Sequence, residues 1–75
     1  MVLIAPRISL DPSIRGGRPV IAGTRVPVDI LVGKVASGMA AAEVAEEYGV
    51  APEDVLAALA YAAQLVSDER VRAAS

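Results

Sequence analysis

The sequence contains no cysteine and no histidine, and its only aromatic residues are two tyrosines. Without cysteine the chain can form neither a disulfide nor a thiolate metal site. Without histidine it lacks the commonest general base and the commonest zinc ligand. The acidic pairs Glu46-Glu47 and Glu53-Asp54 do not replace these groups, because adjacent helical residues point about 100° apart and do not converge on one ion. We therefore expect a non-enzyme, with no catalytic residue, no cofactor and no metal site.

The apolar run Met1–Ala5 is far too short for a membrane span or a signal peptide, so we expect a cytoplasmic protein with no membrane partner. At 75 residues the chain is interpreted as one domain, 1–75, and 55% of its residues are hydrophobic. A domain of this size buries only about 60% of the surface that its unfolded chain exposes. This hydrophobic excess predicts a homodimer or a partner-bound state, because large exposed apolar patches usually mark interfaces.

Charge is distributed unevenly along the chain, although the net charge is only −2. Residues 1–42 carry five basic and two acidic side chains, a net charge of +3. Residues 43–75 carry two basic and seven acidic side chains, a net charge of −5. Such an asymmetry is informative about partners, and here the basic half precedes the acidic one.

The segment GGRPVIAGTRVPV at residues 16–28 shows the most specific local pattern. Val20–Ile21 and Val26–Val28 predict two short strands of a β-ribbon spanning residues 7–28. Ala22–Thr24 predicts the tight turn between them, with Gly23 at positive φ. Upstream, Arg7–Leu10 predicts another short strand. Prolines stand at the strand ends, glycines form the preceding loop, and arginines project from the ribbon: Pro19, Pro27, Gly16, Gly17, Arg15, Arg18 and Arg25.

Apolar periodicity predicts three helices at residues 28–66, over about Val28–Ser37, Ala41–Tyr48 and Pro52–Val66. Gly38 and Gly49 are placed to end the first two helices in a left-handed conformation. The third helix has an apolar stripe for the core or a dimer seam: Val55, Leu59, Ala62 and Val66.

Three further features of the helical region carry expectations. Gly33 inside the first helix is unfavourable by about 1 kcal/mol relative to alanine, and close approach of another backbone is one reason to tolerate it. Tyr61 is expected at the edge of the core or at an interface. Residues 67–75 are expected to be a fraying helix end or a mobile tail.

The second and third helices, joined by Gly49, fit a helix-turn-helix. The predicted fold is therefore mainly α, a three-helix, homeodomain-like bundle behind a short β-ribbon. A groove-reading helix places its first residues against DNA, and here these are Pro52, Glu53 and Asp54. Their carboxylates oppose phosphate binding. A stand-alone DNA-binding transcriptional regulator is accordingly kept as the alternative function.

Motifs throughout residues 7–66 resemble the domain of unknown function 433 family. They comprise Asp11-Pro12, GGRPVI at 16–21, GTRVPV at 23–28, Gly38, Glu43-Val44, Tyr48, Asp54-Val55 and AALAY at 57–61. The resemblance implies an antitoxin of a type II toxin–antitoxin pair that binds and neutralises a PIN-like ribonuclease toxin. It also implies co-repression of its own operon, with operator DNA bound weakly by the chain alone. One departure is Ala51, where serine or threonine would cap the third helix better.

Arginines of the ribbon are the candidate partner-binding residues, because PIN-type nucleases hold Mg²⁺ in an acidic site and arginine pairs with carboxylates in a bidentate way. Arg18 and Arg25 come first and Arg15 next, with Thr24 beside them as a locally bonded turn residue. Internal pairing of the arginines with Asp11 or Asp29 competes with this role. The acidic helices could instead cover a basic surface on the toxin, and the glycines at 16, 17 and 23 could form a backbone nest for an anion.

Overall fold

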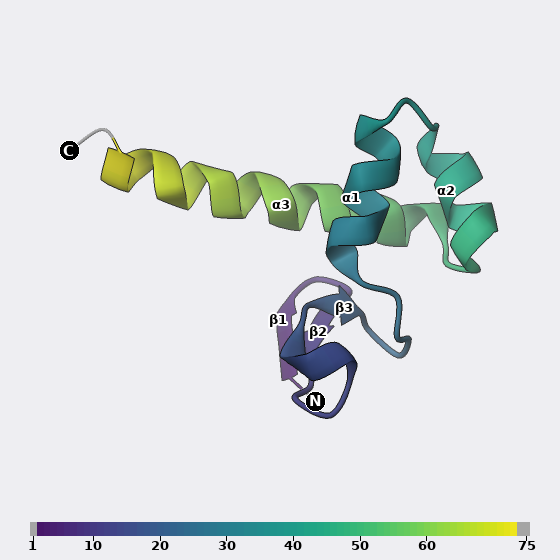
Figure 1. The fold of residues 1–75 in the computed structure, drawn as a ribbon, viewed down its shortest axis with the longest axis horizontal. Coiled ribbons are helices and arrows are strands. Elements are labelled where there is room, and N and C mark those ends of the chain that lie inside the picture. The colour runs from purple at the N-terminus through teal and green to yellow at the C-terminus, as the bar shows by residue number, and fades with distance from the viewer. Residues whose placement is uncertain (1, 74–75) are drawn as a thin grey trace.

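Residues 2–73 are described by the computed structural model, with side chains through Asp68. A small sheet lies on one side of the long helix α3, α1 crosses α3, and α2 lies beside the start of α3 (Figure 1). In chain order the elements are β1 (Val2–Ala5), β2 (Ile8–Leu10), the 3-10 turn η1 (Arg15–Gly17), β3 (Val20–Ile21), α1 (Val28–Ala36), α2 (Ala41–Tyr48) and α3 (Pro52–Ala73). The fold is thus mainly α, with a three-stranded antiparallel sheet at the N-terminus.

The sheet has the strand order β1-β2-β3, and its first strand does not follow from the sequence pattern. Val2 pairs with Leu10 and Ala5 with Ile8, so the apolar run at the N-terminus is an edge strand. Arg7 adopts a φ of +66°, which is uncommon for a residue with a side chain and makes the tight turn between β1 and β2. The predicted strand over Arg7–Leu10 therefore begins one residue later.

The predicted strand over Val26–Val28 is wrong. Only an isolated bridge between Val20 and Pro27 continues the ladder, and Val28 already begins α1. The Val28 N–H donates to the Pro19 carbonyl oxygen at 3.0 Å, which fastens the start of α1 to the segment before β3. By contrast, the turn over residues 22–24 forms as predicted, with Gly23 at a φ of +79°.

The first two helices match their predicted bounds within one residue, and Gly38 and Gly49 follow them at positive φ as predicted. The third helix continues to Ala73, so its predicted end near Val66 is wrong and residues 67–73 are helical; residues 74 and 75 lie outside the described part. Gln64 donates a 3.2 Å hydrogen bond to Asp68 one turn on, and the following Glu, Arg and Ala residues favour helix.

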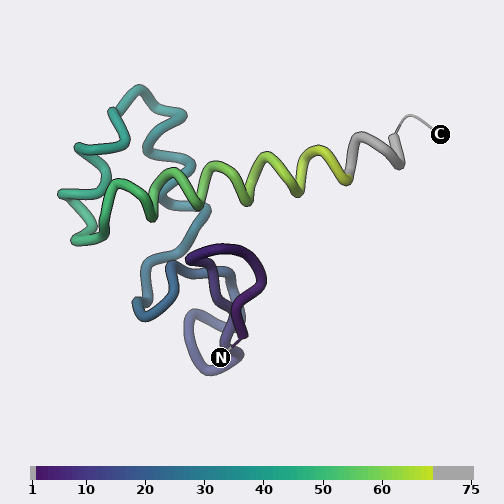
Figure 2. The backbone as a smooth tube through the Cα atoms, turned by 180° about the vertical axis from the view of Figure 1, so that it is seen from behind, coloured from purple at the N-terminus to yellow at the C-terminus, as the bar shows by residue number. Residues whose placement is uncertain are grey.

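The core lies where the sheet, α1, α2 and the first turns of α3 meet. It contains the buried residues Ile8, Ile21, Val28, Leu31, Val44, Ala45, Val55 and Ala58. Of the stripe predicted for α3, Val55 is fully buried, whereas Val66 is 64% exposed. Views from opposite sides show why: beyond its first turns, α3 extends away from the other elements (Figures 1 and 2). No helix within residues 2–73 is long and apolar enough to cross a membrane.

Candidate functional site

The turn between β3 and α1 presents Arg25 on a rigid support. The Thr24 hydroxyl donates to the Ile21 carbonyl oxygen at 2.7 Å and accepts from the Val26 N–H at 3.0 Å. The Ile21 N–H donates to the Val26 carbonyl oxygen at 3.0 Å across the same turn. Thr24 thus bonds locally, as predicted, and it fixes the backbone on both sides of an exposed arginine.

Arg25 and Arg15 differ from the other cationic side chains of the described region. Arg7, Arg18 and Lys34 each lie within 4.0 Å of a carboxylate oxygen, on Asp54, Asp29 and Glu47 respectively. Within residues 2–68, no carboxylate pairs with Arg25 or Arg15. Both side chains are exposed, so two unneutralised positive charges lie on the loops that precede and follow β3.

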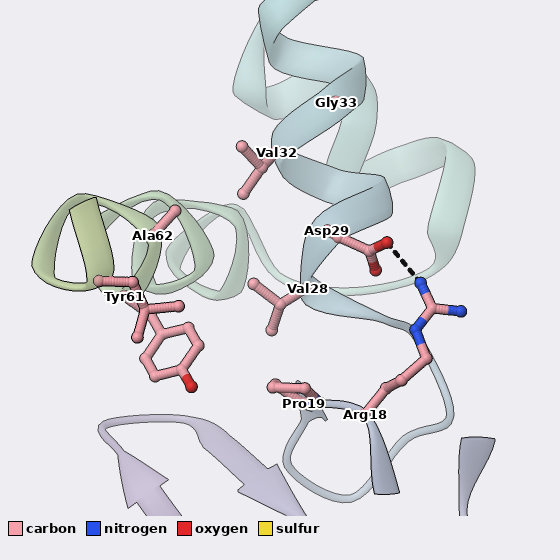
Figure 3. Close-up of a pocket in the computed structure, with 9 residues that line it drawn as sticks. Arg18, Pro19, Val28, Asp29, Val32, Gly33, Tyr61 and Ala62 are labelled. Atoms are coloured by element: carbon pink, nitrogen blue, oxygen red, sulfur yellow. Dashed lines mark hydrogen bonds and ion pairs between the residues drawn. The ribbon is translucent and has the colours of Figure 1, made fainter. Parts of the chain in front are cut away.

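Arg18 differs from the other two candidate arginines because it is already paired within the chain. Its guanidinium forms an ion pair with Asp29 in the first turn of α1, as Figure 3 shows. The structure therefore contains the internal pairing that competes with partner binding at this residue. The two side chains are 46% and 67% exposed, and an ion pair of this kind contributes about 0–1 kcal/mol, so a competing carboxylate can displace Asp29.

The loop that carries Arg15 is a series of left-handed residues, with φ values of +54° at Arg15, +66° at Gly16 and +85° at Gly17. A nest for an anion would need their N–H groups free. The Gly17 N–H instead donates to the Ile14 carbonyl oxygen at 3.1 Å, and the next N–H, of Arg18, donates to the Arg15 carbonyl oxygen at 3.3 Å. These bonds favour the turn interpretation over the nest.

Asp54 at the start of α3 has two roles that the sequence did not reveal. Its Oδ2 accepts from the Ala51 N–H at 3.0 Å, so Asp54 caps the helix from within and offsets the missing cap at Ala51. Its Oδ1 accepts from the Arg7 guanidinium at 2.9 Å, which ties α3 to the β1–β2 turn. The start of α3, which would face DNA in a helix-turn-helix complex, is thus acidic, and Asp54 is already bonded to Arg7 and Ala51.

A second surface lies along α3, where two apolar grooves flank Tyr61 and Leu65. The first groove, of about 410 Å³, lies between α1 and α3 and is lined by Val28, Val32, Gly33, Tyr61, Ala62 and Leu65. Figure 3 shows Tyr61 and Ala62 of α3 facing Val28 and Val32 of α1, with the Arg18–Asp29 ion pair at the rim. The second groove, also of about 410 Å³, lies between α3 and the end of β1 and includes Ile4 and Ala57.

The sequence predicts Tyr61 at the core edge or an interface and another backbone near Gly33, but it does not predict the two grooves. Tyr61 lies at the edge of the core, as predicted, and it also lines both grooves. A Cβ at Gly33 would meet nothing within 4 Å, so the expected close approach of another backbone is wrong within the chain. The signal for the first groove in the sequence was Gly33, an unfavourable residue inside a predicted helix.

The fold is similar to that of a solved structure, whereas the curated proteins show no match at a significant level. A crystal structure of Rv2018 from Mycobacterium tuberculosis is similar, with 36% sequence identity and a TM-score of 0.64 over 69% of this chain. The match covers 24% of the Rv2018 chain, so this protein spans about a quarter of that relative's length.

Residues 8–62 match the family described as "Protein of unknown function (DUF433)". The matched region runs from β2 to the middle of α3. It includes the turn with Arg25, the whole of α1 and α2, and the start of α3 with Asp54. It covers most of the residues that carry the resemblance. The chain therefore belongs to the DUF433 family.

Proposed function

We propose that this protein is a protein-binding antitoxin that neutralises a PIN-like ribonuclease by inserting the Arg25 turn into the acidic active site of the nuclease. The observation that carries the proposal is the state of Arg25: an exposed guanidinium on a rigid turn, without a carboxylate partner among the described residues. The family resemblance is the reason for proposing this partner, and the exposure of Arg25 supports the proposed contact.

A rigid turn suits this task for a physical reason. Binding orders the side chains and loops at an interface, and each ordering step reduces the affinity. The hydrogen bonds of Thr24 hold the backbone beside Arg25 before the partner arrives, so little backbone entropy remains to be lost. A guanidinium that pairs in a bidentate way with metal-binding carboxylates also competes with Mg²⁺ for them.

The three arginines are not equivalent in this proposal. Arg25 pairs first because nothing has to be released. Arg15 lies on the loop before β3, at the other end of this strand from the Arg25 turn, and adds a second unpaired positive charge. Arg18 follows only if the partner displaces Asp29, which is an exposed and weak interaction.

The test is co-expression of the chain with the product of the adjacent gene, followed by copurification and an assay of RNA cleavage. Arg25→Gln removes one positive charge from the turn, and we expect the affinity for the nuclease to fall about ten- to hundredfold. Lys34→Gln is the matched control: it removes the same charge from α1, where Lys34 lies 3.9 Å from Glu47, and the affinity should not change.

Two results would contradict the proposal. One is full neutralisation of the nuclease by Arg25→Gln. The other is a chain that copurifies with no neighbouring product but binds its own promoter alone, with an affinity that falls steeply as salt is raised. That second result would favour a DNA-binding regulator.

A further inference from the structure

The three-stranded sheet has one edge that the fold covers and one edge that it leaves open. On the β3 side, the Ile21 N–H donates to the Val26 carbonyl oxygen at 3.0 Å. The Val28 N–H likewise donates to the Pro19 carbonyl oxygen at 3.0 Å. On the other side β1 is the last strand, and among residues 2–73 no backbone hydrogen bond outside the β1–β2 ladder involves Val2–Ala5. The backbone groups that β1 directs away from β2 therefore have no backbone partner in the described chain.

The side chains of β1 do little to protect this open edge. Charged residues, prolines and bulges on an edge strand hinder its pairing with another chain. β1 contains no charged residue and no proline, and its exposed side chains are apolar: Val2 and Leu3 are each 62% exposed and Ile4 is 39% exposed. Its short length and a register irregularity between Leu3 and Ala5 are the protective features present. They shorten the strand that can be added, but they do not close the edge.

The second groove borders the open edge. Its walls come from one side of α3 and from the end of β1 with the turn after it, at Ile4, Ala5 and Pro6. No described residue of β2 or β3 lines it, so it lies on the outer side of β1. Views from opposite sides show that α3 passes the sheet and continues beyond β1 (Figures 1 and 2). An extended segment beside β1 would thus lie against α3.

The part of α3 beyond β1 is long enough to cover one added strand. Neighbouring strands lie about 4.8 Å apart. From Tyr61 to Asp68, which both line the groove, α3 advances about 10 Å. Leu65 lies between them and is 47% exposed. A fourth strand would therefore have backbone partners in β1 and apolar cover from α3. These are the two contacts of β-strand addition, in which main-chain hydrogen bonds give affinity and pockets for alternate side chains give specificity.

The open edge and the Arg25 turn lie at the same end of the sheet. Ala5 pairs with Ile8, the residue of β2 that also pairs with the end of β3. The Ala22 N–H, in the turn before Arg25, donates to the Arg7 carbonyl oxygen at 2.8 Å and joins the two turns at this end. β1 stands two strand spacings from β3, or about 10 Å. A partner that receives Arg25 therefore has the groove within reach at the same end of the molecule.

We propose that an extended, apolar segment of the nuclease adds to β1 as a fourth strand and places alternate side chains in the groove beside α3. This inference rests on the proposed function for the identity of the partner, and it adds a second contact to the one made by Arg25. The chemistry of the segment follows from the surface. An extended backbone satisfies the open N–H and C=O groups of β1, and apolar side chains match a groove wall formed by Ala57, Ala60 and Leu65.

The test is amide hydrogen exchange of the chain alone and in its complex with the nuclease. In the complex, the N–H groups of Val2–Ala5 that β2 leaves unpaired should exchange at least about tenfold more slowly, because they gain acceptors. Unchanged exchange of these groups in a complex that copurifies would overturn the proposal. So would slower exchange in the chain alone as its concentration is raised, because a second copy would then occupy the edge.

Two alanines of α3 provide a matched pair of variants. Ala60 and Ala63 are both exposed, but of the two only Ala60 lines the groove. Ala60→Glu fills the groove with a charged side chain, so the Kd of the complex should rise about a hundredfold. Ala63→Glu adds the same charge outside both α3 grooves, and its Kd should stay within about twofold of the wild type. Equal Kd values for the two variants would overturn the added strand.

The outcomes separate the added strand from the Arg25 contact. A complex that is weakened by Arg25→Gln but not by Ala60→Glu, with unchanged exchange in β1, overturns the added strand and leaves the proposed function standing. Slowed exchange in β1 together with full neutralisation by Arg25→Gln supports the added strand and contradicts the Arg25 contact. If the chain binds no nuclease, both proposals fall.

Discussion

The two halves of α3 differ in composition and in surroundings: the first is rich in alanine, and the second is more polar. In the first half Val55 and Ala58 are fully buried, and Asp54 is bonded both to the helix start and to Arg7. In the second half Leu65, which lines both grooves, is 47% exposed, and Val66 is 64% exposed. The difference teaches that contact with the rest of the fold divides this helix into one part that stabilises the protein and another whose apolar side chains face solvent.

The largest expected effect is at the centre of the buried half. Val55→Ala removes two methyl groups from a fully buried site and leaves a cavity, so the free energy of unfolding should fall by about 2 kcal/mol. Leu65→Ala, in the exposed half, removes more carbon atoms but should change the stability of the monomer by less than about 0.5 kcal/mol. Urea denaturation of dilute protein measures the free energy of unfolding of both variants. Equal losses would show that the two halves of α3 do not differ in their contribution to stability.

A smaller effect is expected at the start of the buried half. Asp54→Ala removes the bond to the Ala51 N–H and the ion pair with Arg7, so the free energy of unfolding should fall by about 1.5 kcal/mol. Glu53→Ala is the matched control, because Glu53 is exposed and its side chain forms no hydrogen bond or ion pair within residues 2–68; its effect should stay within about 0.5 kcal/mol. If both variants lose equal stability, Asp54 does not anchor the helix.

The smallest effect is a pH dependence on the sheet side of the molecule. Hydrogen bonds from the Ser13 hydroxyl and the Ser13 N–H lower the pKa of Asp11 below its ordinary value. The folded pKa is therefore below the unfolded one, and the stabilisation by Asp11 is complete above the unfolded pKa and lost as pH falls through the folded pKa. An NMR titration of the Asp11 carboxyl carbon should show that Ser13→Ala raises this pKa. An unchanged midpoint would show that the hydroxyl bond is not its cause.

Local chemistry allowed much of this fold to be predicted. Gly38 and Gly49 end their helices, the run over residues 41–48 is helical at the predicted residues, and Gly23 forms the turn beside Arg25. Each of these features depends on residues within a few positions of one another. The candidate arginines were found in the same way, because they stand in or beside the turns that local residues specify.

Long-range packing decided the remaining features. The N-terminal residues became strand β1 by pairing with β2, and Val28 begins α1 while its N–H bonds back to the Pro19 carbonyl oxygen. Only the folded chain shows that Arg18 pairs with Asp29 and that Arg25 has no carboxylate beside it within the described residues. The sequence by itself determined the family, the helices and the turns, because these follow from local conformational preference and motif. Tertiary structure decided which charges are neutralised and which apolar side chains face solvent, because both depend on residues brought together from distant parts of the chain.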